Sequence, residues 1–255
     1  MRVAMITGGG RGLGRAIALA VGRAGLSVAV AARTREQVEA TAADVRAGGG
    51  VAAAVLLDVT DPASVGTAIA RATAELGPID VLVNNAGIAE SAPFAATGLD
   101  TWERHLRVNV TGPYLVTRAA LPGMLERRRG RVVNVASLAG LQGAPYVSAY
   151  TASKHALVGL TRALAAEVAG QGVTVNAVCP GFAATDIVWN GARTIAARTG
   201  RGVDDAVAAL ARLNPGGRLI EPAEVADAVL RLVADDTLNG DTVVLDGTAP
   251  LRRSP

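Results

Sequence analysis

Short apolar runs alternate with segments of helical length from one end of the chain to the other, and this alternation constrains the fold more than any other feature. Several runs are hydrophobic at nearly every position, as expected for parallel strands that are covered on both faces. The expected strands are 3–6, 27–31, 51–57, 81–83, 132–135, 174–178 and 242–245. The expected helices are 14–24, 35–47, 63–75, 101–128, 149–169 and 222–232. Such repeated units predict an α/β fold with a doubly wound, seven-stranded parallel sheet and helices on both faces.

Two stretches interrupt this regular pattern. The helix expected over 101–128 contains Gly112-Pro113 and Pro122, which predict a kink or an irregular turn. The stretch 182–214 lies between a strand and the last helix–strand unit, and it mixes polar residues with large apolar ones. A long insertion at this position is typical of a substrate lid.

The size and charge of the chain narrow its class. The 255 residues suit one domain, 1–255, with a sizeable core. Cys179 is the single cysteine, which excludes an intramolecular disulfide and favours a reducing, cytoplasmic location. We expect no signal peptide and no membrane span, because the chain enters an apolar strand directly after Met1-Arg2 and contains no apolar window of spanning length. The net charge is only +3 and the arginines are scattered, so we expect no nucleic-acid partner.

A glycine-rich loop joins the first expected strand to the first expected helix. Its sequence is Thr7-Gly8-Gly9-Gly10-Arg11-Gly12-Leu13-Gly14. Glycines at this point let the backbone approach a pyrophosphate, and the N-terminus of the helix offers free N–H groups. The spacing is TGxxxGxG, and its place between a strand and a helix predicts a dinucleotide-binding site.

The end of the second strand indicates which dinucleotide is bound. An acidic residue there would bind the ribose hydroxyls of NAD, but the strand ends in Ala32-Arg33. Arg33 suits a 2′-phosphate, and Arg11 in the glycine loop could reach the same group. Each arginine alone could equally be an exposed cation at the start of a helix. Together with the missing acid, they favour NADP(H).

Two further motifs follow later strands. Asp58-Val59 closes the third strand, where the carboxylate could accept a hydrogen bond from the adenine amino group. The alternative is that Asp58 caps the following helix, a role that Thr60 or Asp61 could fill equally well. Asn84-Asn85-Ala86-Gly87 follows the fourth strand, and part of this motif is expected to be structural because asparagine side chains can tie strand ends together.

The pair Tyr150 and Lys154 carries the strongest indication of chemistry. Lys154 is the only lysine among 25 basic residues, and it lies one helical turn after Tyr150 on the same helix face. A fixed cation beside a phenol favours the phenolate and lowers its pKa from about 10. Such a tyrosine can serve as a general acid or base near neutral pH. In isolation, an incidental YxxxK on a surface helix is the alternative.

The motifs together resemble the short-chain dehydrogenase/reductase family over essentially the whole chain, with a Rossmann fold. The resemblance rests on TGxxxGxG, Asp58-Val59, NNAG at 84–87, Asn109, Ser137, YxxxK at 150–154, and Pro180-Gly181 with Thr185. It implies that Tyr150 exchanges the proton with the substrate oxygen and that Lys154 lowers its pKa and binds the nicotinamide ribose. It also implies that Ser137 holds the substrate oxygen and that Asn109 binds a water linking Lys154 to solvent.

The resemblance further implies how the chain is divided and how it assembles. Residues 1–100 would mainly bind the cofactor, and 101–255 would form the catalytic half with a substrate lid at about 182–214. A homotetramer or homodimer would pair the helices at 101–128 and 149–169. No metal is expected. The implied cofactor contacts are Gly8, Arg11, Gly12, Leu13, Gly14, Arg33, Asp58, Val59, Asn85, Ala86, Gly87, Tyr150, Lys154, Pro180, Gly181, Ala183 and Thr185.

The substrate is the least defined part of this interpretation. The run 173–182 resembles 3-oxoacyl thioester reductases and aromatic polyketide ketoreductases, which suggests a small carbonyl or alcohol substrate of the β-keto type. Arg127-Arg128-Arg129 could meet an acidic acyl carrier, or could simply be cations at a helix C-terminus. Two alternatives remain: a dehydrogenase of a small or cyclic secondary alcohol with the same four residues, and a non-catalytic protein that senses the cofactor.

Overall fold

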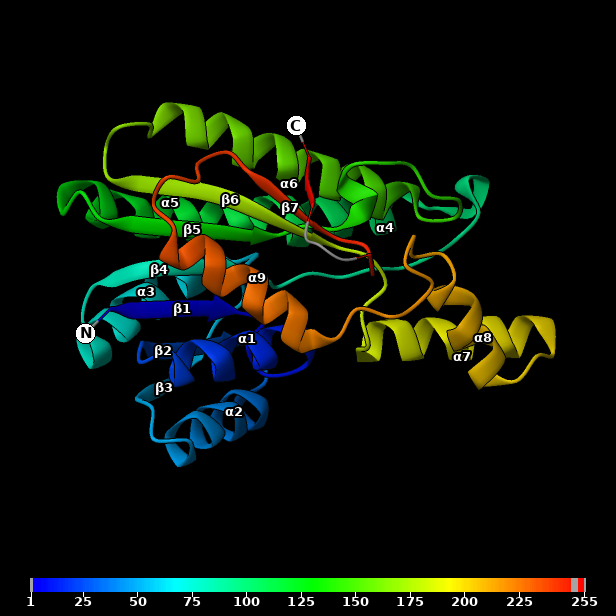
Figure 1. Cartoon of the computed structure of the whole chain (residues 1–255), viewed down its shortest axis with the longest axis horizontal. Helices are drawn as coiled ribbons and strands as arrows, with labels where there is room; N and C mark the ends of the chain where they lie inside the picture. The colour runs from blue at the N-terminus through cyan, green and yellow to red at the C-terminus, as the bar shows by residue number, and fades with distance from the viewer. Residues whose placement is uncertain (1, 249–251, 255) are drawn as a thin grey trace.

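The computed structural model describes residues 2–248 and the backbone of residues 252–254 (Figure 1). Its strands form one sheet in the order β3-β2-β1-β4-β5-β6-β7-β8. The strands are β1 Val3–Thr7, β2 Ser27–Ala32, β3 Ala52–Leu56, β4 Ile79–Asn84, β5 Gly130–Val135, β6 Val173–Pro180, β7 Thr242–Leu245 and β8 Arg252–Ser254. The α-helices are α1 Gly12–Arg23, α2 Arg35–Ala47, α3 Pro62–Leu76, α4 Leu99–Leu106, α5 Gly112–Glu126, α6 Ser148–Glu167, α7 Asp186–Thr199, α8 Val203–Ala211 and α9 Pro222–Ala234.

The expected seven-stranded parallel sheet is confirmed over β1 to β7. The direction of strand addition reverses beside β1, which pairs with both β2 and β4. Ligands of open parallel sheets bind at the carboxyl ends of the strands, where the strand order reverses. Strand β8 pairs antiparallel with β7 and extends the sheet. The sequence had given no indication of β8.

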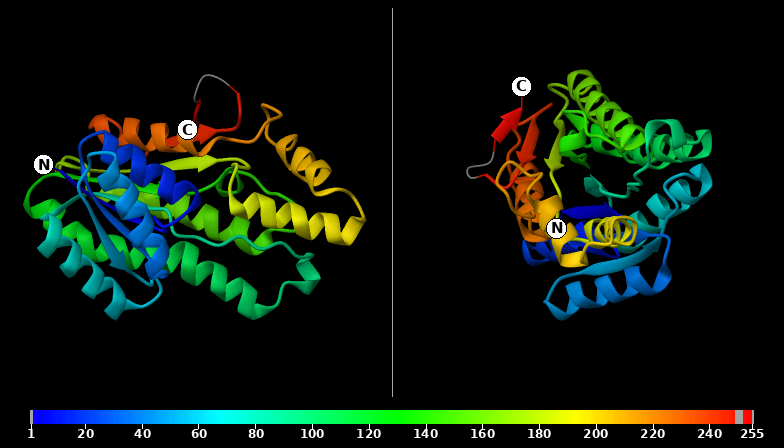
Figure 2. Two further views of the ribbon diagram at one scale, coloured as in Figure 1. Left: turned by 90° about the horizontal axis from the view of Figure 1, so that it is seen from below. Right: turned by 90° about the vertical axis from the view of Figure 1, so that its right-hand side faces the viewer.

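Both faces of the sheet are buried, which explains the continuous apolar runs. Along β1, Ala4 and Ile6 join a cluster with α1, α2 and α9, whereas Val3 and Met5 join a second cluster with α3, α5 and α6. Figures 1 and 2 show these two sets of helices on opposite sides of the sheet. Side chains alternate between the faces of a strand, so a strand covered on both sides needs apolar residues at every position.

The helix expected over 101–128 is interrupted, as the proline pattern predicted, but the interruption lies earlier than Pro113. Helix α4 passes into a π-helical turn, Arg107–Thr111, before α5 begins. Pro113 lies in the first turn of α5, directly after the π turn, and the helix continues through Pro122. Single π turns often occur at functional positions, and this one holds Asn109.

The segment 182–214 forms α7 and α8, which extend past the carboxyl ends of the strands (Figure 1). Asn214 joins the two ends of this segment, because its Oδ1 accepts from the Phe182 N–H at 2.8 Å and its Nδ2 donates to the Phe182 carbonyl at 2.9 Å. Ile187 and Val203 are among its exposed apolar residues, at 51% and 39% exposure. The segment is therefore anchored at its base and carries apolar side chains open to solvent.

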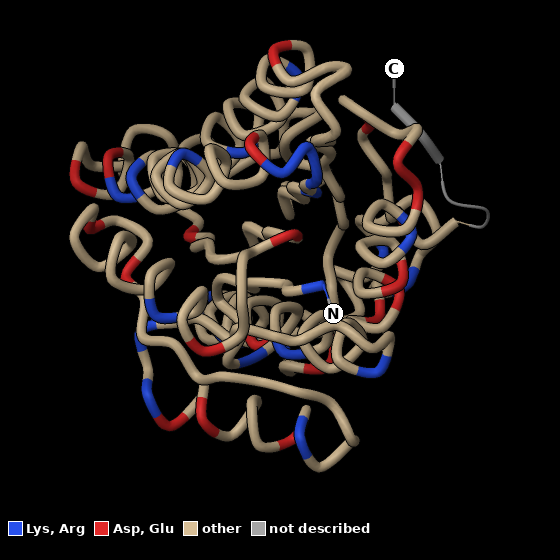
Figure 3. The backbone as a smooth tube through the Cα atoms, turned by 90° about the vertical axis from the view of Figure 1, so that its left-hand side faces the viewer, with Lys and Arg blue, Asp and Glu red and all other residues tan. Residues whose placement is uncertain are grey.

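The three consecutive arginines lie at the amino ends of central strands, opposite to the carboxyl ends where ligands of such sheets bind, so their position does not support the suggested contact with a carrier. Arg129 binds the buried carboxylate of Asp80 with two bonds of 3.0 Å, and Arg127 donates to the Ile79 carbonyl at 2.9 Å. Asp80 and Ile79 open β4, and Arg129 directly precedes β5, so this cluster marks the amino ends of the strands. In Figure 3, basic and acidic positions are interspersed along the outer helices.

Candidate active site

The glycine loop is closely packed against the turn after β4. Gly8 has a φ of +64°, and an added Cβ would lie 2.9 Å from both the Ala86 Cα and the Asn85 Nδ2. A side chain at Gly14 would overlap the Gly8 carbonyl oxygen. Leu13, in contrast, packs its side chain against the core. The loop therefore requires glycine at two positions, and it leaves a backbone surface at the start of α1 that suits a pyrophosphate.

Part of the NNAG motif is structural, as expected. The Thr7 Oγ1 accepts from the N–H groups of Asn85 and Ala86, both at 3.0 Å. Asn85 Nδ2 donates in return to the Thr7 and Gly8 carbonyls, at 2.9 and 3.2 Å. These bonds fix the glycine loop to the end of β4. They leave Gly87 facing the catalytic half of the site, within reach of Asn109 and Lys154.

A buried network of amides continues into the second half of the sheet. Asn84 Nδ2 donates to the Thr117 hydroxyl at 2.9 Å and to the Asn134 Oδ1 at 2.8 Å. Asn134 Nδ2 donates in turn to the Thr161 hydroxyl at 2.8 Å. The network links β4, β5, α5 and α6, and buried polar groups that satisfy one another rigidify the elements that carry them.

The two arginines expected at the 2′-phosphate lie in different surroundings. Arg33 is exposed directly after β2, and its charge helps to lower the pKa of Asp58. Arg11 forms an exposed ion pair with Asp186 at 3.1 Å, which joins the glycine loop to the start of α7. Arg33 therefore remains available as a phosphate ligand at the end of β2, whereas the Arg11 guanidinium is engaged with α7.

The alternative role of Asp58 as a helix cap is excluded. Asp61 caps α3 by accepting from the N–H groups of Ala63 and Ser64, at 3.0 and 3.2 Å. The Asp58 Oδ1 accepts from the N–H and the hydroxyl of Thr60, and these bonds, opposed by desolvation, lower the pKa of its carboxyl. The neighbouring Val59 side chain is buried against Gly112 at the start of α5.

Tyr150, Ser137 and Lys154 are brought together by β5 and α6. Ser137 lies two residues after β5, where its Oγ accepts from the Ala139 N–H at 3.1 Å, and its hydroxyl acts to lower the pKa of Tyr150. Lys154 is 5% exposed; its Nζ lies 5.7 Å from the centre of the Tyr150 ring and donates to the Val135 carbonyl at 2.8 Å. A phenol, a hydroxyl and an ammonium thus share one site at the carboxyl end of the sheet.

The pKa of Tyr150 shifts in the direction opposite to the one that the sequence suggests. Burial raises the pKa of the phenol, and the hydrogen bond from Ser137 offsets this rise only in part. Burial also lowers the pKa of Lys154 from 10.5 to about 8. Desolvation disfavours the charged form of each group, so in this structure both groups are shifted towards neutrality.

Asn109 is fully buried in the π turn, and its amide is engaged on several sides. Its Oδ1 accepts from the Ile88 N–H at 2.9 Å, and its Nδ2 donates to the Ile88 carbonyl at 2.9 Å and to the Ser153 hydroxyl at 3.0 Å. The Ser153 hydroxyl donates to the Tyr150 carbonyl at 2.7 Å. Both amide hydrogens are therefore used, and one lone pair of Oδ1 is left to accept from a water.

The remaining expected cofactor residues lie where β6 meets α7. Pro180 ends β6, and the Gly181 N–H donates to the Leu245 carbonyl at 2.8 Å. A Cβ at Gly181 would overlap the Asn214 side chain. Ala183 is buried in a bridge with Ile220, and Thr185 directly precedes α7 beside Gly12. The segment after β6 thus meets the glycine loop where Thr185 lies beside Gly12.

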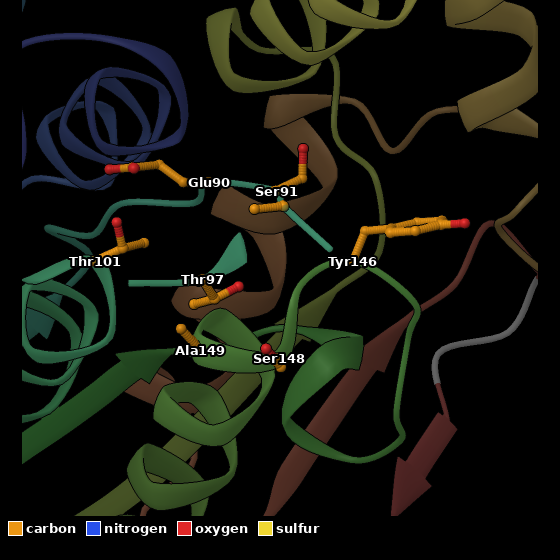
Figure 4. Close-up of a pocket in the computed structure, with 8 residues that line it drawn as sticks. Glu90, Ser91, Thr97, Thr101, Tyr146, Ser148 and Ala149 are labelled. Atoms are coloured by element: carbon orange, nitrogen blue, oxygen red, sulfur yellow. The ribbon is translucent and has the colours of Figure 1, made fainter. Parts of the chain in front are cut away.

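A small cavity of about 70 Å³ lies beside the first turn of α6 (Figure 4). It is lined by Glu90, Ser91, Ala92, Thr97, Thr101, Tyr146, Ser148 and Ala149. The lining is rich in hydroxyl groups, and the Tyr146 ring extends away from the other side chains in Figure 4. Sequence reasoning missed this wall and the buried residues Ser153 and His105 beside it. Their positions depend on contacts between α4, α6 and the segment after β4, which no local pattern encodes.

Neither a metal site nor a membrane-spanning helix is found in the part of the chain that the structure describes. Within residues 2–248, no three or more His, Cys, Asp or Glu side chains gather as a metal site would require. Among the described helices, none has the length and apolar character to cross a membrane.

Comparisons with known proteins agree with this arrangement. The chain is 41% identical to 2-(S)-hydroxypropyl-CoM dehydrogenase 3 of Xanthobacter autotrophicus, over 96% of this chain and 95% of the relative. It is 37% identical to a putative ketoacyl reductase of the granaticin polyketide synthase of Streptomyces violaceoruber, over 92% and 87% of the two chains. A solved structure of the actinorhodin polyketide ketoreductase with NADPH superposes with a TM-score of 0.93 at 35% identity, over 96% of each chain.

A family model described as short chain dehydrogenase matches residues 2–195, which is most of the chain. The chain therefore belongs to the short chain dehydrogenase family and is an oxidoreductase that works with a nicotinamide cofactor.

Proposed function

We propose that this protein interconverts a ketone and a secondary alcohol with NADP(H), and that Tyr150 exchanges the proton with the substrate oxygen. The observation that carries this proposal is the buried Lys154 at the carboxyl end of β5, with its Nζ 5.7 Å from the centre of the Tyr150 ring and Ser137 directly after the same strand. The third hypothesis, a non-catalytic sensor of the cofactor, is disfavoured because both Tyr150 and Lys154 are retained.

The residues at the strand ends fit the expected cofactor. The bare backbone of the glycine loop would hold the pyrophosphate, Arg33 the 2′-phosphate and Asp58 the adenine. Gly87, Pro180, Gly181, Ala183 and Thr185 would line the nicotinamide half. The nicotinamide supplies or accepts the hydride, and the protein has to supply position, one proton and stabilisation of the oxygen.

In the direction of reduction, Tyr150 donates its hydroxyl proton to the carbonyl oxygen while Ser137 donates a hydrogen bond to the same oxygen. A raised pKa keeps the phenol protonated at neutral pH, which suits a general acid. Lys154 binds the nicotinamide ribose and faces the phenol with a positive charge, which favours the departure of the proton. Asn109 holds the π turn and accepts from a water that links Lys154 to solvent.

For the substrate we propose a β-keto compound such as a 3-oxoacyl thioester. The resemblance to a ketoacyl reductase and to a polyketide ketoreductase over most of the chain supports this class. The second candidate is a small secondary alcohol, because the relative at 41% identity is by its name a hydroxypropyl-CoM dehydrogenase. The three arginines lie at the amino ends of the strands, away from the proposed site, so they do not support the docking of an acyl carrier.

A substrate panel tests the reaction class and separates the two candidates. Purified protein with NADPH is mixed with acetoacetyl-CoA, ethyl acetoacetate, small acyclic ketones and cyclic ketones, and the loss of absorbance at the reduced nicotinamide band is followed. We expect the β-keto compounds to have the highest kcat/KM. A preference for the small or cyclic ketones would favour the second candidate, and no turnover with any ketone or alcohol would contradict the proposed function.

Arg33 is expected to determine the choice of cofactor. Replacing Arg33 with Ala removes the cation at the end of β2, so kcat/KM for NADPH should fall about tenfold to a hundredfold while that for NADH changes little. Arg11→Ala is the matched comparison, because it removes a guanidinium that is already paired with Asp186. We expect a smaller effect of Arg11→Ala on the preference. An unchanged preference in both variants would show that neither arginine reads the phosphate.

We further propose that the protein is a cytoplasmic homotetramer or homodimer that pairs α5 and α6. Support comes from Tyr114 on α5, which is 46% exposed, and from the small residues Ala156 and Gly159 on the outer face of α6. The buried free thiol of Cys179 is consistent with a reducing compartment. Light scattering coupled to gel filtration measures the mass, and a monomer would contradict the proposed assembly.

A further inference from the structure

Residues 90–92 form one wall of the hydroxyl-rich cavity. The segment 88–92 that carries this wall is fixed by hydrogen bonds at every second residue. Asn109 binds both main-chain groups of Ile88 at 2.9 Å. The Ala92 N–H donates to the Tyr146 carbonyl at 2.8 Å. Between these anchors, the Glu90 N–H donates to the His105 Nε2 at 3.2 Å. His105 therefore supplies the middle anchor of a wall whose first anchor is Asn109.

The hydrogen-bond partners of His105 determine its tautomer. The ring is fully buried at 0% exposure, and its Nδ1 lies 2.7 Å from the Thr101 carbonyl oxygen. A carbonyl only accepts and an amide N–H only donates, so the hydrogen lies on Nδ1 and the lone pair of Nε2 faces Glu90. The imidazole is then neutral with both nitrogens satisfied.

The same ring contacts the tyrosine that we propose as the proton donor. The ring centres of His105 and Tyr150 lie 6.4 Å apart with an interplanar angle of 76°. Such edge-to-face pairs have a preferred geometry and resist rotation of either ring. Glu90 and Thr101, the two hydrogen-bond partners of His105, both line the cavity (Figure 4). The His105 imidazole thus contacts Tyr150 and also hydrogen-bonds two residues that line the cavity.

We propose that His105 is a positioning residue of the ketone–alcohol reaction, which holds the 88–92 segment in place beside Tyr150 through the hydrogen bond that its Nε2 accepts from the Glu90 N–H. This inference rests on the proposed function of Tyr150. Nε2 is the important atom, because its lone pair accepts the hydrogen bond from the Glu90 N–H. The Nδ1–H donates only to the Thr101 carbonyl, which lies on the same helix. A histidine that merely filled space would be replaceable by leucine without effect on turnover.

Three replacements of His105 separate these contacts. His105→Leu fills the space and removes both hydrogen bonds. His105→Gln places an amide oxygen near the position of Nε2 and can accept from Glu90, whereas His105→Asn places its amide near Nδ1 and can reach only Thr101. Arg104→Gln is the matched control, since it breaks the exposed ion pair with the Glu90 carboxylate at 2.7 Å and leaves the main-chain anchor intact.

Turnover of NADPH with acetoacetyl-CoA, or with the fastest ketone of the panel, is measured alongside the binding of NADPH by fluorescence and unfolding in urea. We expect kcat to fall about tenfold to a hundredfold in His105→Leu and His105→Asn, with the Kd for NADPH unchanged within about twofold, because displacing a reacting group slightly costs rate without affecting a remote binding site. His105→Gln should recover to within about threefold of the parent, and Arg104→Gln should remain close to it.

Every outcome decides the question. A His105→Leu variant with the parental kcat, or equal recovery by Gln and Asn, would overturn the positioning role. Weaker NADPH binding together with a matching loss of stability in urea would also overturn it, because His105 would then serve only the fold. Tyr150→Phe in the same assay keeps the two proposals apart. If that variant is active, the proposed function fails; if it is inactive while His105→Leu is normal, only this inference fails.

Discussion

Replacing Tyr150 with Phe should lower kcat for ketone reduction about a thousandfold or more. The change removes one oxygen atom and leaves the ring, so the edge-to-face contact with His105 persists. What is lost is the phenol beside Lys154, and with it the proton that the carbonyl oxygen must receive. General acid catalysis by a positioned group contributes about 10²–10⁴ in rate, and the lost orientation of the substrate oxygen adds to this.

The measurement is kcat and KM for the best ketone of the panel, together with the Kd for NADPH. Cofactor binding should persist, because the glycine loop that we propose to hold the pyrophosphate joins β1 to α1 and is not part of α6. Tyr114→Phe is the matched control, since it removes a phenol from α5, at the proposed interface between subunits, and its mass is checked by light scattering before kcat is compared. Its kcat should remain within about twofold of the parent. A Tyr150→Phe variant that retains a tenth or more of the activity would contradict the assignment of the proton donor.

The parallel sheet was predictable because burial on both faces leaves a strong signal in the sequence. The residues of β1 from Val3 to Ile6 are all apolar, since each contacts one of two core clusters. β8 has no such signal, because it is a short antiparallel edge strand that follows from pairing with β7 rather than from an apolar run. Edge strands are short and are determined by their neighbours, so local patterns describe them poorly.

The proposed catalytic residues were selected from motif order, which does not describe their surroundings. The sequence places Lys154 one turn after Tyr150 and therefore suggests a lowered pKa of the phenol. In the structure desolvation is the largest cause of both shifts, and it raises the pKa of Tyr150 and lowers that of Lys154. The charge of Arg129 was equally visible, but its partner Asp80 lies 49 residues earlier in the chain. Whether a cluster of charges lies at the amino or the carboxyl ends of the strands depends on such distant contacts.

Lys154 gives the second large effect, because replacing it should remove activity and increase stability at the same time. Burial holds the pKa of its ammonium at about 8, against 10.5 in an unfolded chain. Below about pH 8 the folded protein therefore carries a desolvated charge that opposes folding. Between about pH 8 and 10.5 the folded state binds fewer protons than the unfolded state, so the free energy of unfolding should rise with pH in this window.

Lys154→Met keeps the length of the side chain and removes the charge. The shift corresponds to roughly 3 kcal/mol, and the lost bond to the Val135 carbonyl offsets about 1 kcal/mol of it. We therefore expect the variant to be about 2 kcal/mol more stable than the parent at pH 7, and this gain should fall with rising pH and give way to a loss of about 1 kcal/mol above about pH 10.5. Ketone reduction should fall about a hundredfold or more, because the phenol loses the cation that favours proton release.

Urea unfolding at pH 7 and 9.5, with kcat measured on the same samples, tests both halves of this expectation. Lys154→Arg is the control for charge. A guanidinium cannot be neutralised and is larger than an ammonium, so this variant should be both less stable and poorly active. Full activity of Lys154→Arg would show that any cation suffices, and a loss of stability in Lys154→Met at pH 7 would show that the ammonium is favourably bound. The single lysine of the chain is expected to lower stability because catalysis requires a buried charge beside Tyr150, a conflict that is common at active sites.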